Sequence, residues 1–142
     1  MGGKSLVKFE YSEDFEKMDK IADELLSEHD KENGVEYNFN KFSFIAHDGD
    51  KLVGILTGYS YYSEITINNL FVLKEYRGRG VGSRLIKMVE QRFKDDGFNN
   101  INLVTNEFQA PGFYKKCGFK LEFIRRNEHN PKFTKYFFIK YL

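Results

Sequence analysis

The chain has 142 residues, a normal size for one compact domain, and we expect a single domain over residues 1–142. Hydrophobic residues make up 41% and aromatic residues 17%, so a sizeable core can form and disorder is not expected. The formal net charge is only +1, from 22 Lys+Arg against 21 Asp+Glu. This balance argues against a nucleic-acid binder, which would need a clear basic excess.

The sequence also argues against a membrane protein and against a metal-binding protein. No apolar run approaches the roughly 18 residues of a membrane span, and none follows the N-terminus as a secretory signal would. The single cysteine, Cys117, cannot form an internal disulfide, which fits a reducing cytoplasm. One cysteine and three scattered histidines, at 29, 47 and 129, do not make a convincing metal site. We therefore expect a cytoplasmic protein without membrane, nucleic-acid or metal partners.

The N-terminal segment predicts a strand followed by a helix. Residues 6–11 alternate apolar and polar side chains, which is typical of a strand. Ser12 is the expected N-cap of a helix whose apolar residues recur on one face. The pair Asn33-Gly34 is expected to end that helix.

A hairpin and a further strand should come next. Residues 41–47 and 51–62 alternate, and Asp48-Gly49-Asp50 between them predicts a β-hairpin turn. Residues 65–73 continue the sheet, but their apolar positions change phase across Asn68-Asn69. Two explanations remain open: a strand covered on both faces, or a β-bulge whose extra residue re-phases the side chains.

The second half of the chain predicts two helices and three strands. They are expected at residues 81–97, 101–105, 110–117, 119–126 and 133–142. Gly97 and Gly118 are expected to end the two helices. The predicted order is β-α-β-β-β-α-β-α-β-β, an α/β fold with a mixed, mostly antiparallel central sheet flanked by helices.

The most informative segment is the glycine-rich loop Arg77-Gly78-Arg79-Gly80-Val81-Gly82, between a predicted strand and a predicted helix. Its glycines allow backbone angles closed to other residues, so successive N–H groups can converge on an anion at the positive helix end. We expect a phosphate or pyrophosphate there. The loop lacks the Gly-Lys-Ser/Thr of a nucleotide-hydrolase P-loop and the G-x-G-x-x-G spacing of a dinucleotide fold.

Two segments resemble the GNAT superfamily of N-acetyltransferases. The glycine loop is similar to the family signature R/Q-x-x-G-x-G/A. Residues 110–119, Ala-Pro-Gly-Phe-Tyr-Lys-Lys-Cys-Gly-Phe, are similar to the family segment A-x-x-F-Y-x-x-x-G-F. The resemblance is specific over residues 65–119, with Lys74 standing where many members have proline. It implies a GNAT-like fold, acetyl-CoA as co-substrate and acetyl transfer to a primary amine.

The resemblance also implies where the coenzyme binds. In the family, the fourth strand bulges and splays from the fifth, which favours the bulge at Asn68-Asn69 and leaves backbone groups free for the pantetheine arm. Backbone N–H groups of residues 78–83 would hold the pyrophosphate. The implied coenzyme-binding residues are Leu70, Phe71, Val72, Arg77, Gly78, Arg79, Gly80, Val81, Gly82, Ser83, Asn106, Phe113 and Tyr114. The usual family spacing would place the asparagine at Glu107 instead of Asn106.

Tyr114 is the implied catalytic residue. Amine attack on a thioester expels a thiolate, and a phenol with an ordinary pKa of about 10 suits that leaving group as a proton donor. Without the motif, a tyrosine packed beside Phe113 would be the simpler interpretation. Glu64, Glu107 and a water chain are alternative general bases. Cys117 is interpreted as a packing residue, because no histidine lies nearby in the sequence.

The acceptor is expected to be a small-molecule amine that attacks directly within a ternary complex. Its pocket should be lined by the first helix, residues 33–40 and a tyrosine-rich strand. The side chains that would suit a cationic amine are Glu32, Glu36, Tyr59, Tyr61 and Tyr62. The alternative function is a non-catalytic acyl-CoA-binding or regulatory module. The apolar run at residues 136–141 is explained either by a homodimer edge or by the sheet core.

Overall fold

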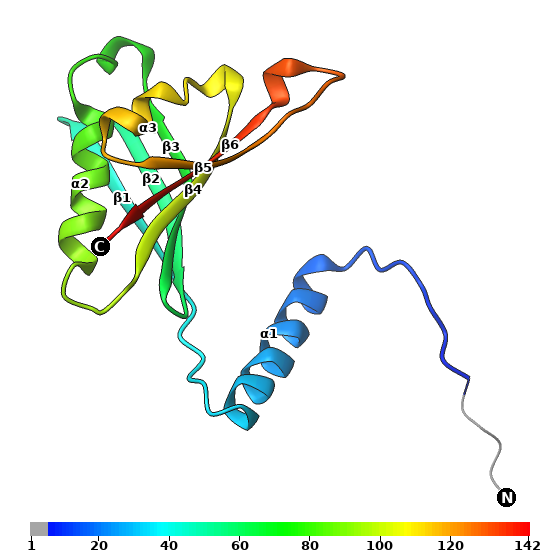
Figure 1. Cartoon of the computed structure of the whole chain (residues 1–142). Coiled ribbons are helices and arrows are strands. Elements are labelled where there is room, and N and C mark those ends of the chain that lie inside the picture. Colours follow the sequence, from blue (N-terminus) through cyan, green and yellow to red (C-terminus); the bar gives the residue numbers. More distant parts are fainter. Residues whose placement is uncertain (1–5) are drawn as a thin grey trace, which may run out of the picture. The chain divides into compact units, whose positions relative to one another are not determined.

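The computed structural model describes residues 6–142, in two compact units that meet in sequence between Tyr37 and Asn38. The described part of the first unit contains one helix, α1 (Phe15–Glu32), and the second unit, Asn38–Leu142, contains the sheet (Figure 1). The single domain expected over residues 1–142 stays a prediction.

The N-cap of helix α1 lies two residues later than expected. The Asp14 carboxylate accepts a hydrogen bond from Lys17 N at 3.1 Å and is the N-cap, whereas Ser12 Oγ accepts one from Asp14 N at 3.3 Å. The prediction of Ser12 as N-cap is therefore wrong, because the Asp14 side chain reaches the third helical N–H. Asn33 closes the helix and Gly34, with φ of +70°, follows it as predicted.

Residues 6–11 do not form the predicted first strand. They have no regular secondary structure, and their apolar side chains Leu6, Val7, Phe9 and Tyr11 are exposed. A strand needs a neighbour to complete its hydrogen bonds, and among residues 6–142 none pairs with this segment. The alternation of apolar and polar side chains in residues 6–11 was therefore not enough to predict a strand.

The second unit is built on a six-stranded sheet with the order β1-β2-β3-β4-β6-β5. The strands are β1 (Asn40–Asp48), β2 (Lys51–Tyr61), β3 (Glu64–Val72), β4 (Asn100–Asn106), β5 (Lys120–Arg125) and β6 (Lys135–Tyr141). Only the β3–β4 pair is parallel. This confirms the predicted mixed, mostly antiparallel α/β fold. Because β6 lies between β4 and β5, the apolar run at residues 136–141 belongs to the sheet interior and not to an edge.

The helix α2 (Val81–Phe93) covers one face of β1, β2 and β3 (Figure 1). Its buried residues Leu85, Ile86, Val89 and Phe93 pack into one core with strand residues such as Leu56, Ile65, Ile67 and Ile101. Gly97, at φ of +81°, ends the turn after the helix. The helix predicted over residues 81–97 is confirmed, although it ends at Phe93, and its packing fixes the loop before α2 against the sheet.

The strand β3 changes partners halfway along its length. Toward β2, Asn69 faces Thr57 and Ile67 faces Gly58, so Asn68 is an extra residue. Toward β4, the parallel pairing covers only residues 64–67. A Cβ at Gly58 would stand 2.3 Å from Thr66 O, so the strands need glycine at this point. The bulge near Asn68 is therefore confirmed, and β3 and β4 separate there.

Candidate coenzyme site

Beyond the bulge, β3 has an open backbone edge. Leu73 N–H donates to Val53 O of β2 at 2.9 Å. Backbone groups alternate along a strand, so those of Phe71 also face β2, while those of Leu70 and Val72 face away from it. Pairing with β4 has already ended at Ile67. An extended molecule with amide groups can bond to this edge as another strand would.

The glycine loop lies at the end of this open strand. A 3₁₀ turn, η1 (Lys74–Tyr76), leads to Gly78 and Gly80, whose φ angles of +76° and +80° are in the left-handed region that favours glycine. Gly80 is the N-cap of α2 and has no side chain to cap it. The N–H groups of the first helical turn are therefore available for an anion at the positive end of the helix.

A cavity of about 690 Å³ joins the open strand, the glycine loop and the short helix α3 (Gly112–Lys116). It is lined by Leu70, Phe71, Val72, Tyr76, Arg77, Gly78, Gly80, Val81, Gly82, Ser83, Phe108, Gln109, Ala110, Phe113 and Tyr114. Eleven of the thirteen residues expected at the coenzyme site thus surround one hollow. Their role in binding stays a prediction.

The other two candidates, Arg79 and Asn106, are not in the cavity lining. The Arg79 guanidinium lies 4.9 Å from the centroid of the Tyr76 ring. Asn106 is the N-cap of the 3₁₀ turn η2 (Glu107–Gln109), and both its N–H and its Nδ2 donate to Gln109 Oε1 at 3.0 Å. The side chain of Asn106 therefore holds the turn that brings Gln109 to the cavity.

Sequence reasoning missed four lining residues: Tyr76, Phe108, Gln109 and Ala110. Three of them follow Asn106, and the capping-box pattern from Asn106 to Gln109 was a signal that the chain turns there. Tyr76 adjoins the glycine loop, and its hydroxyl donates to the carboxylate of Asp48, the last residue of β1, which raises the pKa of Tyr76. This bond ties the glycine loop to the hairpin.

Arg77 carries a positive charge to the junction of the strand and the loop. Its Nε donates to Val72 O at 3.0 Å, and its guanidinium lies 5.5 Å from the centroid of the Phe71 ring. A guanidinium at this point suits a diphosphate, because its several N–H donors match phosphate oxygens.

Gly82 lets α2 and α3 approach each other. A Cβ at residue 82 would stand 3.1 Å from Phe113 Cζ and 3.8 Å from Val72 Cγ2. The loop therefore needs glycine for two reasons. Gly78 and Gly80 adopt left-handed backbone angles, and Gly82 leaves room for the close packing of α2 against α3.

Tyr114 lies at the α3 side of the cavity and is 9% exposed. Its ring packs against those of Phe113, Phe119 and Phe138, with centroid distances of 5.2, 6.0 and 5.8 Å. Burial, with a smaller contribution from Cys117, raises the pKa of Tyr114 to about 12. The phenol therefore keeps its proton at neutral pH and can donate a hydrogen bond into the cavity.

The two glutamates considered as general bases have other partners. Glu64 Oε1 accepts a hydrogen bond from Asn100 Nδ2 at 3.0 Å. Glu107 accepts one from the Tyr136 hydroxyl, which raises the pKa of Tyr136. Neither carboxylate lines the cavity. The general base stays unassigned between these glutamates and a water chain.

Two further sequence-based expectations concern cysteine chemistry and metals. Burial raises the pKa of the Cys117 thiol, which keeps it in the less nucleophilic protonated form. Within residues 6–142, no three His, Cys, Asp or Glu side chains gather as metal ligands would. In the same part of the chain, no helix is both long enough and apolar enough to span a membrane.

A bulged strand with an open edge, a glycine loop at a helix N-terminus and a buried tyrosine line one cavity. The model of the Acetyltransferase (GNAT) family matches residues 7–119. The chain belongs to the GNAT acetyltransferase family. The match includes the whole strand–loop–helix segment and α3.

Two curated GNAT relatives match part of the chain. Blasticidin-S acetyltransferase of Streptomyces morookaense is 38% identical over 72 residues, which cover 50% of this chain and 53% of the relative. N-alpha-acetyltransferase 30 of Schizosaccharomyces pombe (strain 972 / ATCC 24843) is 31% identical over 91 residues, which cover 58% of this chain and 60% of the relative. The chain thus spans a little over half the length of these relatives.

Solved GNAT structures resemble the fold over more of its length. An acetyltransferase from Bacillus cereus ATCC 14579 superposes with a TM-score of 0.77 at 26% identity, covering 95% of this chain and 98% of that one. A Bacillus anthracis str. Ames protein described as a streptothricin acetyltransferase, solved with acetyl coenzyme A, gives a TM-score of 0.64 at 25% identity. The second alignment covers 78% of this chain and 67% of that one.

Proposed function

We propose that the chain is an N-acetyltransferase that moves an acetyl group from acetyl-CoA to a primary amine by direct attack in a ternary complex. The observation that carries this proposal is the cavity shared by the open edge of β3, the first turn of α2 and Tyr114. Family membership and the acetyl-coenzyme-A-bound neighbour support the choice of co-substrate. The cytoplasm is the proposed compartment, since Cys117 is the only cysteine of the sequence.

The chain's own groups fit acetyl-CoA. Outward-facing backbone groups of Leu70 and the N–H of Val72 can bond the amides of the pantetheine arm, while Val72 O already accepts a hydrogen bond from Arg77 Nε. The N–H groups of Gly82 and Ser83 would hold the pyrophosphate, and Arg77 would supply positive charge beside it. The fit needs no metal.

In the proposed reaction, the neutral amine nitrogen attacks the thioester carbon. A C–N bond forms, the C–S bond breaks and the sulfur leaves as a thiolate. The nitrogen gives its proton to the general base, a glutamate or a water chain, from which the proton passes to solvent or to the thiolate. The Tyr114 hydroxyl would donate a hydrogen bond to that sulfur as negative charge develops, because its raised pKa keeps it protonated. Full transfer of this proton would need the general base to return a proton to Tyr114, since a phenol with a pKa of about 12 is a weaker acid than a thiol. A thiol has an ordinary pKa of about 8.5, so the thiolate is a fair leaving group and water can give part of this help.

For the acceptor, we propose a small cationic amine. A second hollow of about 650 Å³ opens at β1, β2 and the bulge residue Asn68. Phe39 and Tyr59 line it with ring centroids 5.4 Å apart, and aromatic faces attract ammonium groups. Asn68 lines this hollow and Leu70 lines the coenzyme cavity, so only two strand positions separate the two sites. The name of the relative Blasticidin-S acetyltransferase also favours a small-molecule acceptor.

A panel of amines with acetyl-CoA, read as release of free CoA, tests this function. We expect turnover with at least one small cationic amine and none with matched alcohols. If only peptide N-termini are acetylated, the acceptor is a protein and not a small molecule. If acetyl-CoA binds but no amine in a broad panel releases CoA, the non-catalytic binding module becomes the better explanation. A homodimer is not required by any of these steps.

A further inference from the structure

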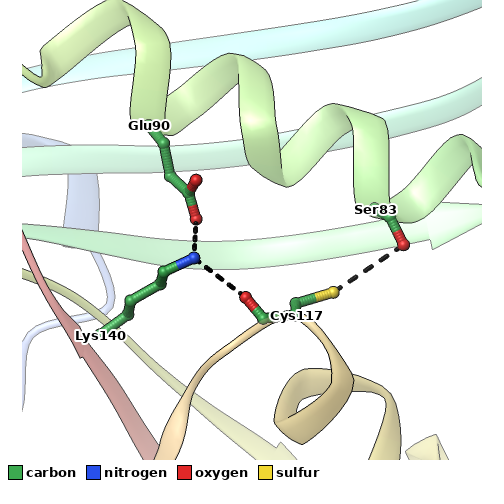
Figure 2. Close-up of polar contacts among 4 residues, drawn as sticks. All are labelled: Ser83, Glu90, Cys117 and Lys140. Carbon is green, nitrogen blue, oxygen red and sulfur yellow. Dashed lines mark hydrogen bonds and ion pairs between the residues drawn. The ribbon is translucent and has the colours of Figure 1, made fainter.

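A single ammonium group joins β6, α2 and the end of α3 (Figure 2). Lys140 Nζ on β6 lies 2.6 Å from Glu90 Oε1 on α2. The same Nζ donates to Cys117 O, at the C-terminus of α3, at 3.0 Å. The Lys140 and Glu90 side chains are only 30% and 24% exposed, so water screens this pair less than a surface pair.

The residue after α3 makes room for this contact. Gly118 has φ of +92°, in the left-handed region, and a Cβ there would stand 3.1 Å from Lys140 Nζ and 3.3 Å from Cε. Any other residue would combine backbone strain with a tight contact that Lys140 could relieve only by moving a few tenths of an ångström. The glycine that ends α3 therefore also lets Lys140 reach the end of the helix.

A second contact fixes the same end of α3. Cys117 Sγ lies 3.9 Å from Ser83 Oγ, in the first turn of α2 and in the cavity lining (Figure 2). Ser83 and Glu90 are about two helical turns apart. The end of α3 is thus held along α2 both near the coenzyme cavity and two turns away from it.

The helix α3 depends on such contacts because it is short. It has five residues, and a helix of that length has little stability of its own. Tyr114 belongs to this helix, and its carbonyl accepts a hydrogen bond from Phe119 N at 3.0 Å, just beyond Gly118. A displacement of the C-terminus of α3 would therefore move the Tyr114 hydroxyl relative to the glycine loop.

We propose that Lys140, paired with Glu90, is a positioning residue that holds α3 against α2 and so sets the place of Tyr114 in the cavity. Its catalytic consequence rests on the proposed acetyl transfer, whereas its effect on α3 does not.

The test compares Glu90→Gln and Lys140→Met with a matched control, Asp96→Asn. Asp96 pairs with Arg92 at 3.5 Å, both side chains are well exposed, and the pair links only the last turn of α2 to the turn that follows it. Amide hydrogen exchange at Cys117, Gly118 and Phe119 should become about 10-fold faster in the two test variants, as local opening requires. It should not change in Asp96→Asn. Lys140→Arg, which keeps a cation, should restore much of the protection.

Kinetics give the second readout. We expect kcat to fall about 10-fold in Glu90→Gln at nearly constant acetyl-CoA affinity, since a misplacement of about 1 Å can cost up to 10²-fold. In a Tyr114→Phe background, the same substitution should cause almost no further loss. Exchange rates equal to those of the control, or an equal kcat loss in both backgrounds, would overturn the positioning role. If the wild type turns over no amine, the proposed function fails, and the exchange rates still decide the role of Lys140.

Discussion

At the scale of single residues, Tyr114 combines packing with a protonated hydroxyl. Its pKa is raised by burial from an ordinary value of 10.0 to about 12. The unfolded chain would lose this proton near pH 10, while the folded chain keeps it to higher pH. The stabilisation that follows is complete below pH 10 and is lost as the pH rises toward 12. The hydroxyl is therefore fully protonated throughout any ordinary assay range.

Tyr114→Phe keeps the ring and its contacts but removes the hydroxyl. We predict a fall in kcat of up to 10²–10⁴-fold, the usual range for general acid help, with little change in acetyl-CoA affinity. The factor should be the same at pH 6.5 and pH 8.5, because the pKa of Tyr114 lies above both values. Steady-state kinetics with a working acceptor, together with coenzyme titration, measure both quantities.

Tyr136→Phe is the matched control. Its hydroxyl bonds Glu107 and does not line the cavity, so kcat should stay within about twofold of wild type. Equal rates in the wild type and Tyr114→Phe would leave an acetyltransferase whose proton donor is another group.

At the scale of elements, the strand–loop–helix segment could be predicted from the sequence because its signals are local. Glycine spacing indicated a loop with backbone angles closed to other residues, and the structure finds them at Gly78 and Gly80. The phase change at Asn68-Asn69 left two explanations open, and the family resemblance favoured the bulge that the structure shows. Residues 6–11 could not be interpreted correctly, because alternation does not show whether a neighbouring strand is available. The lining residue Ala110 was missed for another reason. The φ of Ala110, +56°, is unusual for a non-glycine residue, and no sequence pattern predicts it.

The loop can be tested with two glycines in the same backbone state. Gly80 and Gly97 have φ of +80° and +81°, and a Cβ at either would meet no atom within 4 Å. Aspartate at either site should therefore cost about 1 kcal/mol of folding free energy through backbone strain. Only Gly80→Asp should abolish acetyl-CoA binding, because its carboxylate would repel the pyrophosphate at the start of α2.

Calorimetric titration of both glycine variants, with their melting temperatures, separates binding from stability. Normal coenzyme affinity in Gly80→Asp would show that the loop is only a structural turn and does not bind the pyrophosphate. Equal loss of affinity in Gly97→Asp would mean that the loop acts only through global stability.

At the scale of the whole molecule, the sheet unit contains both hollows that the proposed reaction would use, one for the coenzyme and one for the amine. The separation of β3 from β4 after Ile67 opens the coenzyme cavity, and the bulge at Asn68 borders the aromatic hollow. The sequence allowed the fold class and the element order after residue 14 to be predicted. It could not indicate that the chain divides after Tyr37, because that division depends on contacts between distant residues and not on local pattern.

The central claim is that the open edge of β3 and the glycine loop form one acetyl-CoA site. Thermal unfolding of the wild-type chain with and without acetyl-CoA tests it most directly. At 100 times the dissociation constant, the coenzyme should raise the free energy of unfolding by about 2.7 kcal/mol, and the melting temperature should rise with ligand concentration. A well-folded sample whose melting temperature is unchanged by millimolar acetyl-CoA and by millimolar CoA would contradict the claim.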